Sequence, residues 1–356
     1  MSTVTGSRPR PTGAKHIPRH IRQIGLAAGI VGLVVLTMFG CTMANPASTG
    51  EPAPKSLVQI SDWAAPVLLT GDQINTPYTE QNPFMSPDER TLYFTSNRPE
   101  ADGDTNLDQN IWVSKRATRN DPWGAPQLVA ALNSPANELG SKITIDGRLV
   151  FFFSNREGNN DIYWSSRWNP RDDFGWNTPQ KVGEIGEGVN TAENENAPVY
   201  WFGQLYFARG DQPSGNSDIY VATVNRSGEV LQPAVPVAEL NSQSSPSTAA
   251  NGNDAAPTIR IDGREIFFWR GSMTSTDIWT STRRSIFDNW STPVPVTAFN
   301  TEFGDTTCFL SWDARTMIFD SSRPGSVPAP STAPSRDLWI STRTIEIRLP
   351  HWDSWD

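Results

Sequence analysis

The stretch SPDERTLYFTSNR (86–98) decides the fold, because it recurs four more times in altered form. The copies are TIDGRLVFFFSNR (144–156), WFGQLYFAR (201–209), RIDGREIFFWR (260–270) and SWDARTMIFDSSR (311–323). The spacings between successive copies are 58, 57, 59 and 51 residues, measured between Asp88, Asp146, Gly203, Asp262 and Asp313. Five copies at a nearly constant period indicate a chain built from five similar units.

Each unit carries two further signatures. The first is an Asp or Asn followed by an aliphatic and an aromatic residue, as in NIWVSKR (110–116), DIYWSSR (161–167), DIYVATV (218–224), DIWTSTR (277–283) and DLWISTR (337–343). The second is a Trp with a Pro three residues later, as in WAAP (63–66), WGAP (123–126), WNTP (176–179) and WSTP (290–293). The third unit has LQPAVP (231–236) in its place, so we expect an irregular third blade.

These elements predict an all-β protein, a five-bladed β-propeller of four-stranded antiparallel blades. An Asp-Gly turn between apolar runs is a strong hairpin signal, and four-stranded units at this period are typical of propeller blades. Because a Trp-x-x-Pro segment precedes the first unit, we expect 63–69 to complete the last blade, with 344–350 as the competing segment. The propeller is predicted over 61–346, with blades near 80–128, 138–182, 195–237, 254–296 and 63–69 plus 305–343, and a tail over 347–356.

The N-terminal segment, residues 1–40, has five basic and no acidic residues and ends in an uncharged apolar run from Ile24 to Gly40. It is predicted to be a signal peptide or membrane anchor. Gly40 before Cys41 resembles the lipobox of bacterial lipoproteins, which makes Cys41 the candidate for lipidation; an uncleaved anchor is the alternative. Residues 41–60 are rich in Pro, Ala and Ser and are predicted to be a flexible linker.

Composition excludes several classes of function. Beyond residue 40 the chain has 24 basic and 38 acidic residues, a balance of −14, which argues against a nucleic-acid partner. All three histidines lie outside the repeats, so neither His-based zinc ligation nor a Ser-His-Asp triad is expected there. We expect no cofactor, no catalytic residue that the sequence identifies, and a monomer.

The repeated motifs resemble the WD40-like (PD40) repeats of TolB-type β-propellers, whose blades contain similar SPDG, LYFSSNR and DIW motifs. The Trp-Gly-x-Pro motif and the following Leu-Asn pairs (132–133 and 240–241) resemble a subgroup of predicted bacterial lipoproteins. The resemblance covers roughly 63–343. It implies the propeller fold, an extracytoplasmic location on the periplasmic face or cell surface, and partners in the envelope.

Every unit has a carboxylate eight residues before its turn marker. These acids are predicted at the start of the innermost strands, near the mouth of the central channel: Glu80, Glu138, Glu195, Asp254 and Asp305. A ring of five carboxylates there could bind a cation, a basic partner or a sugar. The alternative pairs each acid with a repeated arginine in interblade ion pairs: Arg98, Arg156, Arg209, Arg270 and Arg323.

A second candidate site is the loop PEADGDTNLDQ (99–109), in which Asp102, Asp104 and Asp108 follow a spacing similar to that of a calcium loop. An EF-hand loop ends in a Glu that binds the ion, but this chain has Val113 at that position, so this metal site is a weak prediction.

Two functions follow from these observations. The main interpretation is a non-catalytic interaction or scaffold propeller, tethered to the bacterial envelope and binding a protein or an envelope polymer such as a polysaccharide or peptidoglycan. The alternative is a carbohydrate-active, glycosidase-like enzyme that uses carboxylates at the channel mouth.

If Cys41 is lipidated, the mature protein should differ in mass from the full chain in two ways. Signal peptidase cleavage before Cys41 would remove residues 1–40, and the new N-terminus would carry a lipid. Intact-mass analysis of the protein extracted from membranes measures both changes. An unmodified chain that begins at Met1 would contradict lipoprotein processing.

Overall fold

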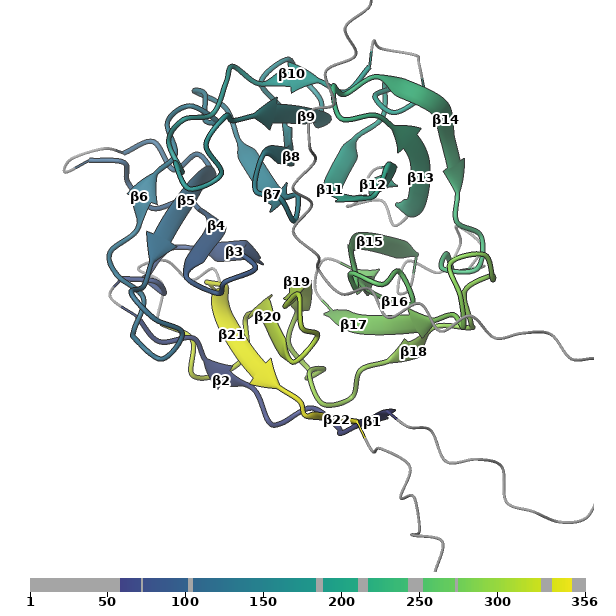
Figure 1. The fold of residues 1–356 in the computed structure, drawn as a ribbon. Helices are drawn as coiled ribbons and strands as arrows, with labels where there is room; N and C mark the ends of the chain where they lie inside the picture. Colours follow the sequence, from purple (N-terminus) through teal and green to yellow (C-terminus); the bar gives the residue numbers. More distant parts are fainter. Residues whose placement is uncertain are drawn as a thin grey trace, which may run out of the picture. The chain divides into compact units, whose positions relative to one another are not determined.

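The structure is a computed structural model that describes residues 58–71, 73–101, 105–183, 188–210, 217–242, 252–272, 275–327 and 335–347. The predicted signal segment, Cys41, Asp102 and Asp104 lie outside these residues. None of the helices in the described ranges is long and apolar enough to cross a membrane. The repeats form five four-stranded antiparallel sheets arranged as the blades of a propeller (Figure 1), as the sequence predicts.

Each blade runs outward from an innermost strand, and the four strands follow one another in the chain. The first four blades are β3 (Glu80–Met85), β4 (Thr91–Ser96), β5 (Asn110–Lys115) and β6 (Gln127–Leu128); β7 (Glu138–Ile143), β8 (Leu149–Ser154), β9 (Asp161–Ser166) and β10 (Gln180–Lys181); β11 (Glu195–Trp201), β12 (Gln204–Arg209), β13 (Asp218–Val224) and β14 (Val230–Pro236); and β15 (Asn253–Ile259), β16 (Glu265–Ser272), β17 (Ser275–Thr282) and β18 (Val294–Pro295).

The fifth blade closes the ring by joining the two ends of the domain. It contains β19 (Asp305–Leu310), β20 (Thr316–Ser321) and β21 (Asp337–Thr342), and its outermost strand is the N-terminal β2 (Val67–Leu68). The competing C-terminal segment forms β22 (Ile345–Ile347), which pairs instead with β1 (Val58–Ile60). Closure of this kind leaves no open blade at the junction of the chain ends.

Two of the repeated signatures meet in a cation–π contact. In four blades the arginine that ends the third strand lies over the ring of the Trp-x-x-Pro tryptophan, with 4.2 to 4.4 Å to the ring centroid: Arg116 over Trp123, Arg167 over Trp176, Arg283 over Trp290 and Arg343 over Trp63. The same arginines donate Nε–H to the carbonyl of a turn residue with positive φ: Glu89, Gly147, Gly263 and Ala314. The arginine thus fixes the hairpin turn and the outer strand to one another.

A repeated asparagine fastens each blade to the next. Its Oδ1 accepts a hydrogen bond from the backbone N–H of one residue in the third strand of the preceding blade, and its Nδ2 donates to the C=O of that same residue. The pairs are Asn75 with Leu338, Asn133 with Ile111, Asn190 with Ile162, Asn241 with Ile219 and Asn300 with Ile278. Asn75 makes this contact across the closure of the ring, between residues 263 apart in the sequence.

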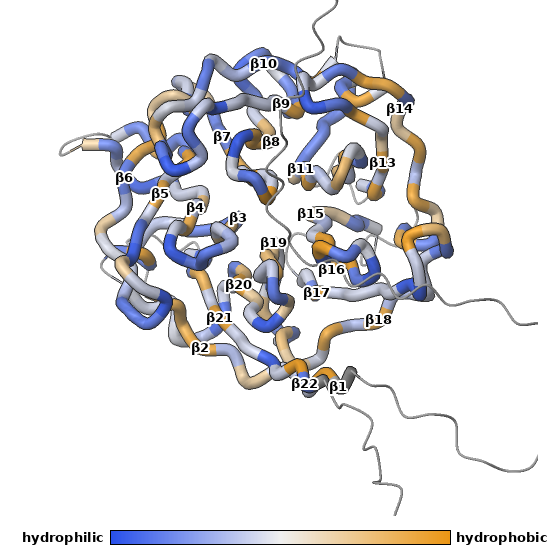
Figure 2. Tube along the Cα trace, viewed as in Figure 1, coloured by the Kyte–Doolittle hydropathy of each residue, from blue (hydrophilic) through white to orange (hydrophobic). Residues whose placement is uncertain are grey.

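The hydrophobic core lies between neighbouring blades. One cluster joins Phe151 and Ile162 of the second blade to Leu205 and Phe207 of the third. Figure 2 shows apolar stretches distributed over all five blades. Each sheet packs one face against the preceding blade and the other face against the next blade. Apolar side chains therefore occur on both faces of the sheet, as expected for sheets covered on both sides.

Loss of the Asn75 side chain should destabilise the fold. Asn75→Ala removes two hydrogen bonds to Leu338 and one to the carbonyl of Leu69, so we expect the free energy of unfolding in urea to fall by about 2–3 kcal/mol. Asn177→Ala is the matched control, because exposed Asn177 donates to Ser166 at the surface and should change stability by less than about 0.5 kcal/mol. Equal losses in the two variants would contradict the role of Asn75.

Candidate functional site

The five repeated acids lie at the inner strand ends, and every one of them is bonded to an arginine. Their side chains are 0 % exposed. The distances between carboxylate oxygen and guanidinium nitrogen are 2.9, 3.0, 2.9, 2.6 and 2.6 Å for Glu80–Arg98, Glu138–Arg156, Glu195–Arg209, Asp254–Arg270 and Asp305–Arg323. All five carboxylates are therefore enclosed by protein atoms and occupied by hydrogen bonds.

These pairs lie within blades, which corrects the expectation of interblade pairs. The innermost and second strands run antiparallel, so the acid that begins one strand stands opposite the end of the next, as Glu80 does opposite Ser96. In the first, second and fifth blades the arginine follows two residues after this position and folds back onto the acid. In the third and fourth blades Arg209 and Arg270 stand directly opposite the acid. The other N–H groups of the arginine reach the chain segment that arrives from the preceding blade, for example at the carbonyl of Ile74.

Further contacts fix the pairs in place. Each arginine lies between two aromatic rings of its own blade, as Arg98 does at 5.1 Å from Phe94 and 5.4 Å from Trp112. Glu80 also accepts hydrogen bonds from Thr76 and Ser96. Burial raises the pKa of Glu80 to about 7 and also raises the pKa of Glu195 and Asp254.

A pocket with a polar lining lies at the same ends of the innermost strands. It has a volume of about 380 Å³, and its lining is rich in amide and hydroxyl side chains, including Gln81, Asn137, Asn160, Asn196 and Thr307. The ring acids are not among its lining residues.

The strands between the two ends are bent by bulges. The pairing register shifts in all five innermost strands, and Asn82, Gly140, Ala197 and Ala256 have positive φ at the bulge. A Cβ on Gly140 would lie 2.8 Å from the ring of Phe153. Bulges of this kind change the direction of a strand next to a site, and here they separate the ring acids from the opposite strand ends.

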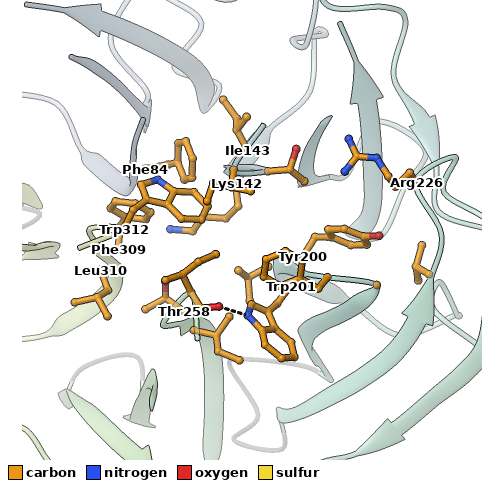
Figure 3. Close-up of a pocket in the computed structure, with 18 of the residues that line it drawn as sticks. Phe84, Lys142, Ile143, Tyr200, Trp201, Arg226, Thr258, Phe309, Leu310 and Trp312 are labelled. Atoms are coloured by element: carbon orange, nitrogen blue, oxygen red, sulfur yellow. Dashed lines mark hydrogen bonds between the residues drawn. The ribbon is translucent and has the colours of Figure 1, made fainter. Parts of the chain in front are cut away.

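The opposite ends of the innermost strands surround a second pocket, which we call the channel-mouth pocket (Figure 3). Its volume is about 420 Å³. All five blades contribute to it, and its lining residues include Phe84, Lys142, Ile143, Tyr200, Trp201, Phe202, Arg226, Thr258, Phe309 and Trp312. An apolar and aromatic lining with a few polar groups is typical of small-molecule sites of this size.

The irregular third blade gives this pocket much of its character. Trp201 and Gln204 pair directly, so Phe202 and Gly203 form a two-residue turn with positive φ at both positions (42° and 94°). The side chain of Phe202 is 67 % exposed. Its positive φ is a backbone conformation that a bulky residue rarely adopts. Strain of this kind at an exposed aromatic residue is a common feature of binding sites.

Two tryptophans hold fixed positions in the pocket wall. Trp201 donates its indole N–H to the carbonyl of Ile261 at 2.8 Å, and a Cβ on Gly263 would lie 2.3 Å from its ring. Trp312 donates to the carbonyl of Met85 at 3.1 Å and contacts Phe84 and Phe309 edge-on. Both bonds cross from one blade to the next, so the rings are positioned before any ligand arrives.

Lys142 extends toward Phe309 and Trp312 on the side of the fifth blade (Figure 3). Its side chain is 8 % exposed, and its Nζ donates to the carbonyls of Pro83 at 2.7 Å and Cys308 at 3.3 Å. Sequence analysis did not single out this lysine or the tryptophans, because its markers were repeated residues and this pocket is built from residues that differ between blades. The missing turn Asp in the third unit was the one available signal.

The calcium site stays a prediction, because the structure describes only one of its three carboxylates. Asp108 accepts a hydrogen bond from Asn106, and Asp102 and Asp104 lie outside the described residues. Among the residues that the structure describes, no group of three His, Cys, Asp or Glu side chains is placed to hold a metal ion.

Comparison with known proteins gives the fold class. No known family and no curated protein matches this sequence. Among solved structures, the α-L-arabinofuranosidase from Lactobacillus brevis is 17 % identical with a TM-score of 0.52, over 78 % of this chain and 94 % of that one. The catalytic domain of the Coprinopsis cinerea GH62 α-L-arabinofuranosidase is 11 % identical with a TM-score of 0.52, over 80 % and 97 %.

The similar structures also include TolB-type propellers. The putative TolB from Agrobacterium tumefaciens is 17 % identical with a TM-score of 0.43, over 77 % of this chain and 82 % of that one. At such identities a likeness establishes the fold and no activity.

One interpretation of the sequence is corrected by these comparisons. The main interpretation was a non-catalytic interaction propeller, but the arabinofuranosidases that share the fold at a TM-score of 0.52 are enzymes, one of them matched as a catalytic domain. The fold therefore gives no support to the main interpretation, and the alternative remains a hypothesis. The activity itself has to be argued from the site of this chain.

The acid–arginine pairs predict that removing one partner destabilises the fold more than removing the charge of both partners. Arg323→Leu leaves the carboxylate of Asp305 buried without its partner, and we expect a loss of about 3–5 kcal/mol in the free energy of unfolding. Combining it with Asp305→Asn should restore part of this loss. The control, Arg264→Leu, removes an exposed pair with Asp262 and should cost less than about 1 kcal/mol in the same denaturation experiment.

Proposed function

We propose that the protein is carbohydrate-active and holds a saccharide in the channel-mouth pocket. The observation that carries this proposal is the pocket itself, in which two tryptophans with fixed ring planes enclose a few polar groups. A sugar ring has apolar C–H faces and polar edges. Aromatic faces with hydroxyl and amine groups beside them complement both.

The polar groups are few and well placed. Thr258 lies on the innermost strand of the fourth blade, Lys142 on that of the second, and Arg226 at the rim beside the third. Tyr200 stacks on Phe151 with ring centroids 4.9 Å apart, so its ring is also held by packing. A preorganised lining of this kind loses little conformational entropy on binding.

The ring acids do not form the catalytic pair of this proposal. Glycosidases use two carboxylates that flank the scissile bond, roughly 5 to 9.5 Å apart in an open site. The five ring acids are buried and paired with arginines, and no carboxylate lines the channel-mouth pocket in the described part of the chain. The proposal therefore assigns saccharide binding to this pocket and names no paired-carboxylate mechanism.

The shared fold suggests the first ligands to test. The two similar structures are α-L-arabinofuranosidases, so arabinose-containing oligosaccharides belong in the first panel. If Cys41 tethers the chain as the sequence predicts, the protein would meet these polymers outside the cytoplasm, in the bacterial envelope.

The test measures binding and cleavage with the same panel. Neutral and acidic oligosaccharides are titrated calorimetrically against the full-length protein, and cleavage is followed by mass spectrometry of the products. Trp201→Ala removes one wall of the pocket and should weaken binding by about tenfold or more, since burying a large apolar side chain contributes about 1.5–3 kcal/mol.

Trp168→Ala provides the control. Trp168 is 87 % exposed and is not part of the pocket lining, so this variant should bind as the wild type does. Equal losses in the two variants, or a panel in which no saccharide binds, would contradict the proposal.

A further inference from the structure

Lys142 places a positive charge at the base of the channel-mouth pocket. It is the fifth residue of β7, and its side chain extends toward the first and fifth blades, where Nζ donates to Pro83 and Cys308. Nζ also lies 5.5 Å from the ring centroid of Phe309. The amine therefore sits among aromatic groups and innermost strands instead of in solvent.

This amine lacks the counter-charge that other buried cations of the chain have. The arginines of the five ring pairs are each bonded to a carboxylate, whereas no described carboxylate lies within 4 Å of Lys142 Nζ. An ammonium has three N–H donors, and two protein carbonyls accept from this one among the described residues. A buried charge without a partner is costly, which calls for an explanation.

The charged side chains that line the pocket are both basic. Lys142 and Arg226 line it, and no Asp or Glu does so in the part of the chain that the structure describes. Arg226 is half-exposed at the rim and pairs with Asp146, so its charge is partly compensated. Lys142 is thus the cation of this lining that forms no ion pair with a described carboxylate, in a protein with a net charge of −9.

We propose that the channel-mouth pocket selects an acidic saccharide, a uronic acid unit whose carboxylate binds the Lys142 ammonium. This inference rests on the proposed carbohydrate function and names its substrate class. The carboxylate would accept the remaining N–H of Lys142 and supply the missing counter-charge, while the sugar ring lies against Trp201 and Trp312. Charge-assisted hydrogen bonds of this kind are about twice as strong as neutral ones.

Two titratable groups act on this amine from the fifth blade. They are the thiol of Cys308, whose pKa burial raises to about 12, and the carboxylate of Asp320, which accepts hydrogen bonds from Thr306, Thr307 and Arg336. Burial lowers the pKa of Lys142 to about 8, and these two groups oppose that effect. Lys142 is therefore charged at pH 7 and loses its charge as the pH rises through about 8.

The test compares oligogalacturonates with their methyl esters, in which an uncharged ester carrying one added methyl group replaces each carboxylate. Wild-type full-length protein should bind the free acid about tenfold or more tightly than the ester at pH 7. This preference should fall as the pH rises from 7 to 10, because the ammonium is lost while the uronate stays charged. The wild-type pH series requires no variant and so remains informative if a substitution impairs folding.

Variants identify the residue responsible. Lys142→Met should reduce the ratio of the two affinities to about one, and near-native thermal unfolding would show that the fold is retained. Lys181→Met removes the same charge from an outer strand, where Lys181 pairs with Asp161 and Glu157, and should leave the ratio unchanged.

The outcomes separate this inference from the proposed function. If neutral and acidic saccharides bind equally well, with a ratio that does not vary with pH, the acidic preference is wrong and saccharide binding stands. If no saccharide of either kind binds, the proposed function fails as well. Equal effects of Lys142→Met and Lys181→Met would show a general charge effect and overturn the assignment to Lys142.

Discussion

A buried carboxylate bonded to an arginine recurs in all five blades, and the rest of the architecture is arranged around it. The acid begins the innermost strand, the arginine ends the hairpin that follows, and the guanidinium reaches the chain arriving from the blade before. One interaction therefore sets the hairpin register and the position of the next blade. Net energy from such a pair is small, but removing either partner leaves a charge that the interior cannot solvate.

The placement of these pairs divides each innermost strand into two parts. Repeated residues occupy the beginning of the strand, where they are buried and bonded to one another. Residues that differ from blade to blade occupy the other end, where Lys142, Trp201 and Thr258 meet in one pocket. Structural and ligand-facing roles are thus separated along a single strand, and the opposite ends of the five strands can change independently of the bonds that hold the ring together.

The sequence predicted the parts of this protein that repeat. Periodic Asp-Gly turns and the Asp-Ile-Trp and Trp-x-x-Pro motifs were sufficient for five four-stranded blades, since hairpins depend on local turn chemistry. The partners of Arg98 and its equivalents could be assigned only from the antiparallel register of the strands. The pairs predicted between blades proved to lie within blades. The pocket was not predicted, because the repeat search followed residue types that recur. Lys142 stands four residues before its turn marker, where the other units have Phe84, Val199, Thr258 and Phe309, and these positions meet only when the ring closes.

Ring closure through Asn75 and Leu338 has a kinetic consequence. The two partners are separated by almost the whole domain, so during synthesis the N-terminal strand has no partner until the last blade has emerged. Contacts between such distant segments form slowly, because the chain must first lose the entropy of a long loop. The fifth blade is consequently the last to be completed, and a nascent chain exposes unpaired strand edges there until its synthesis ends.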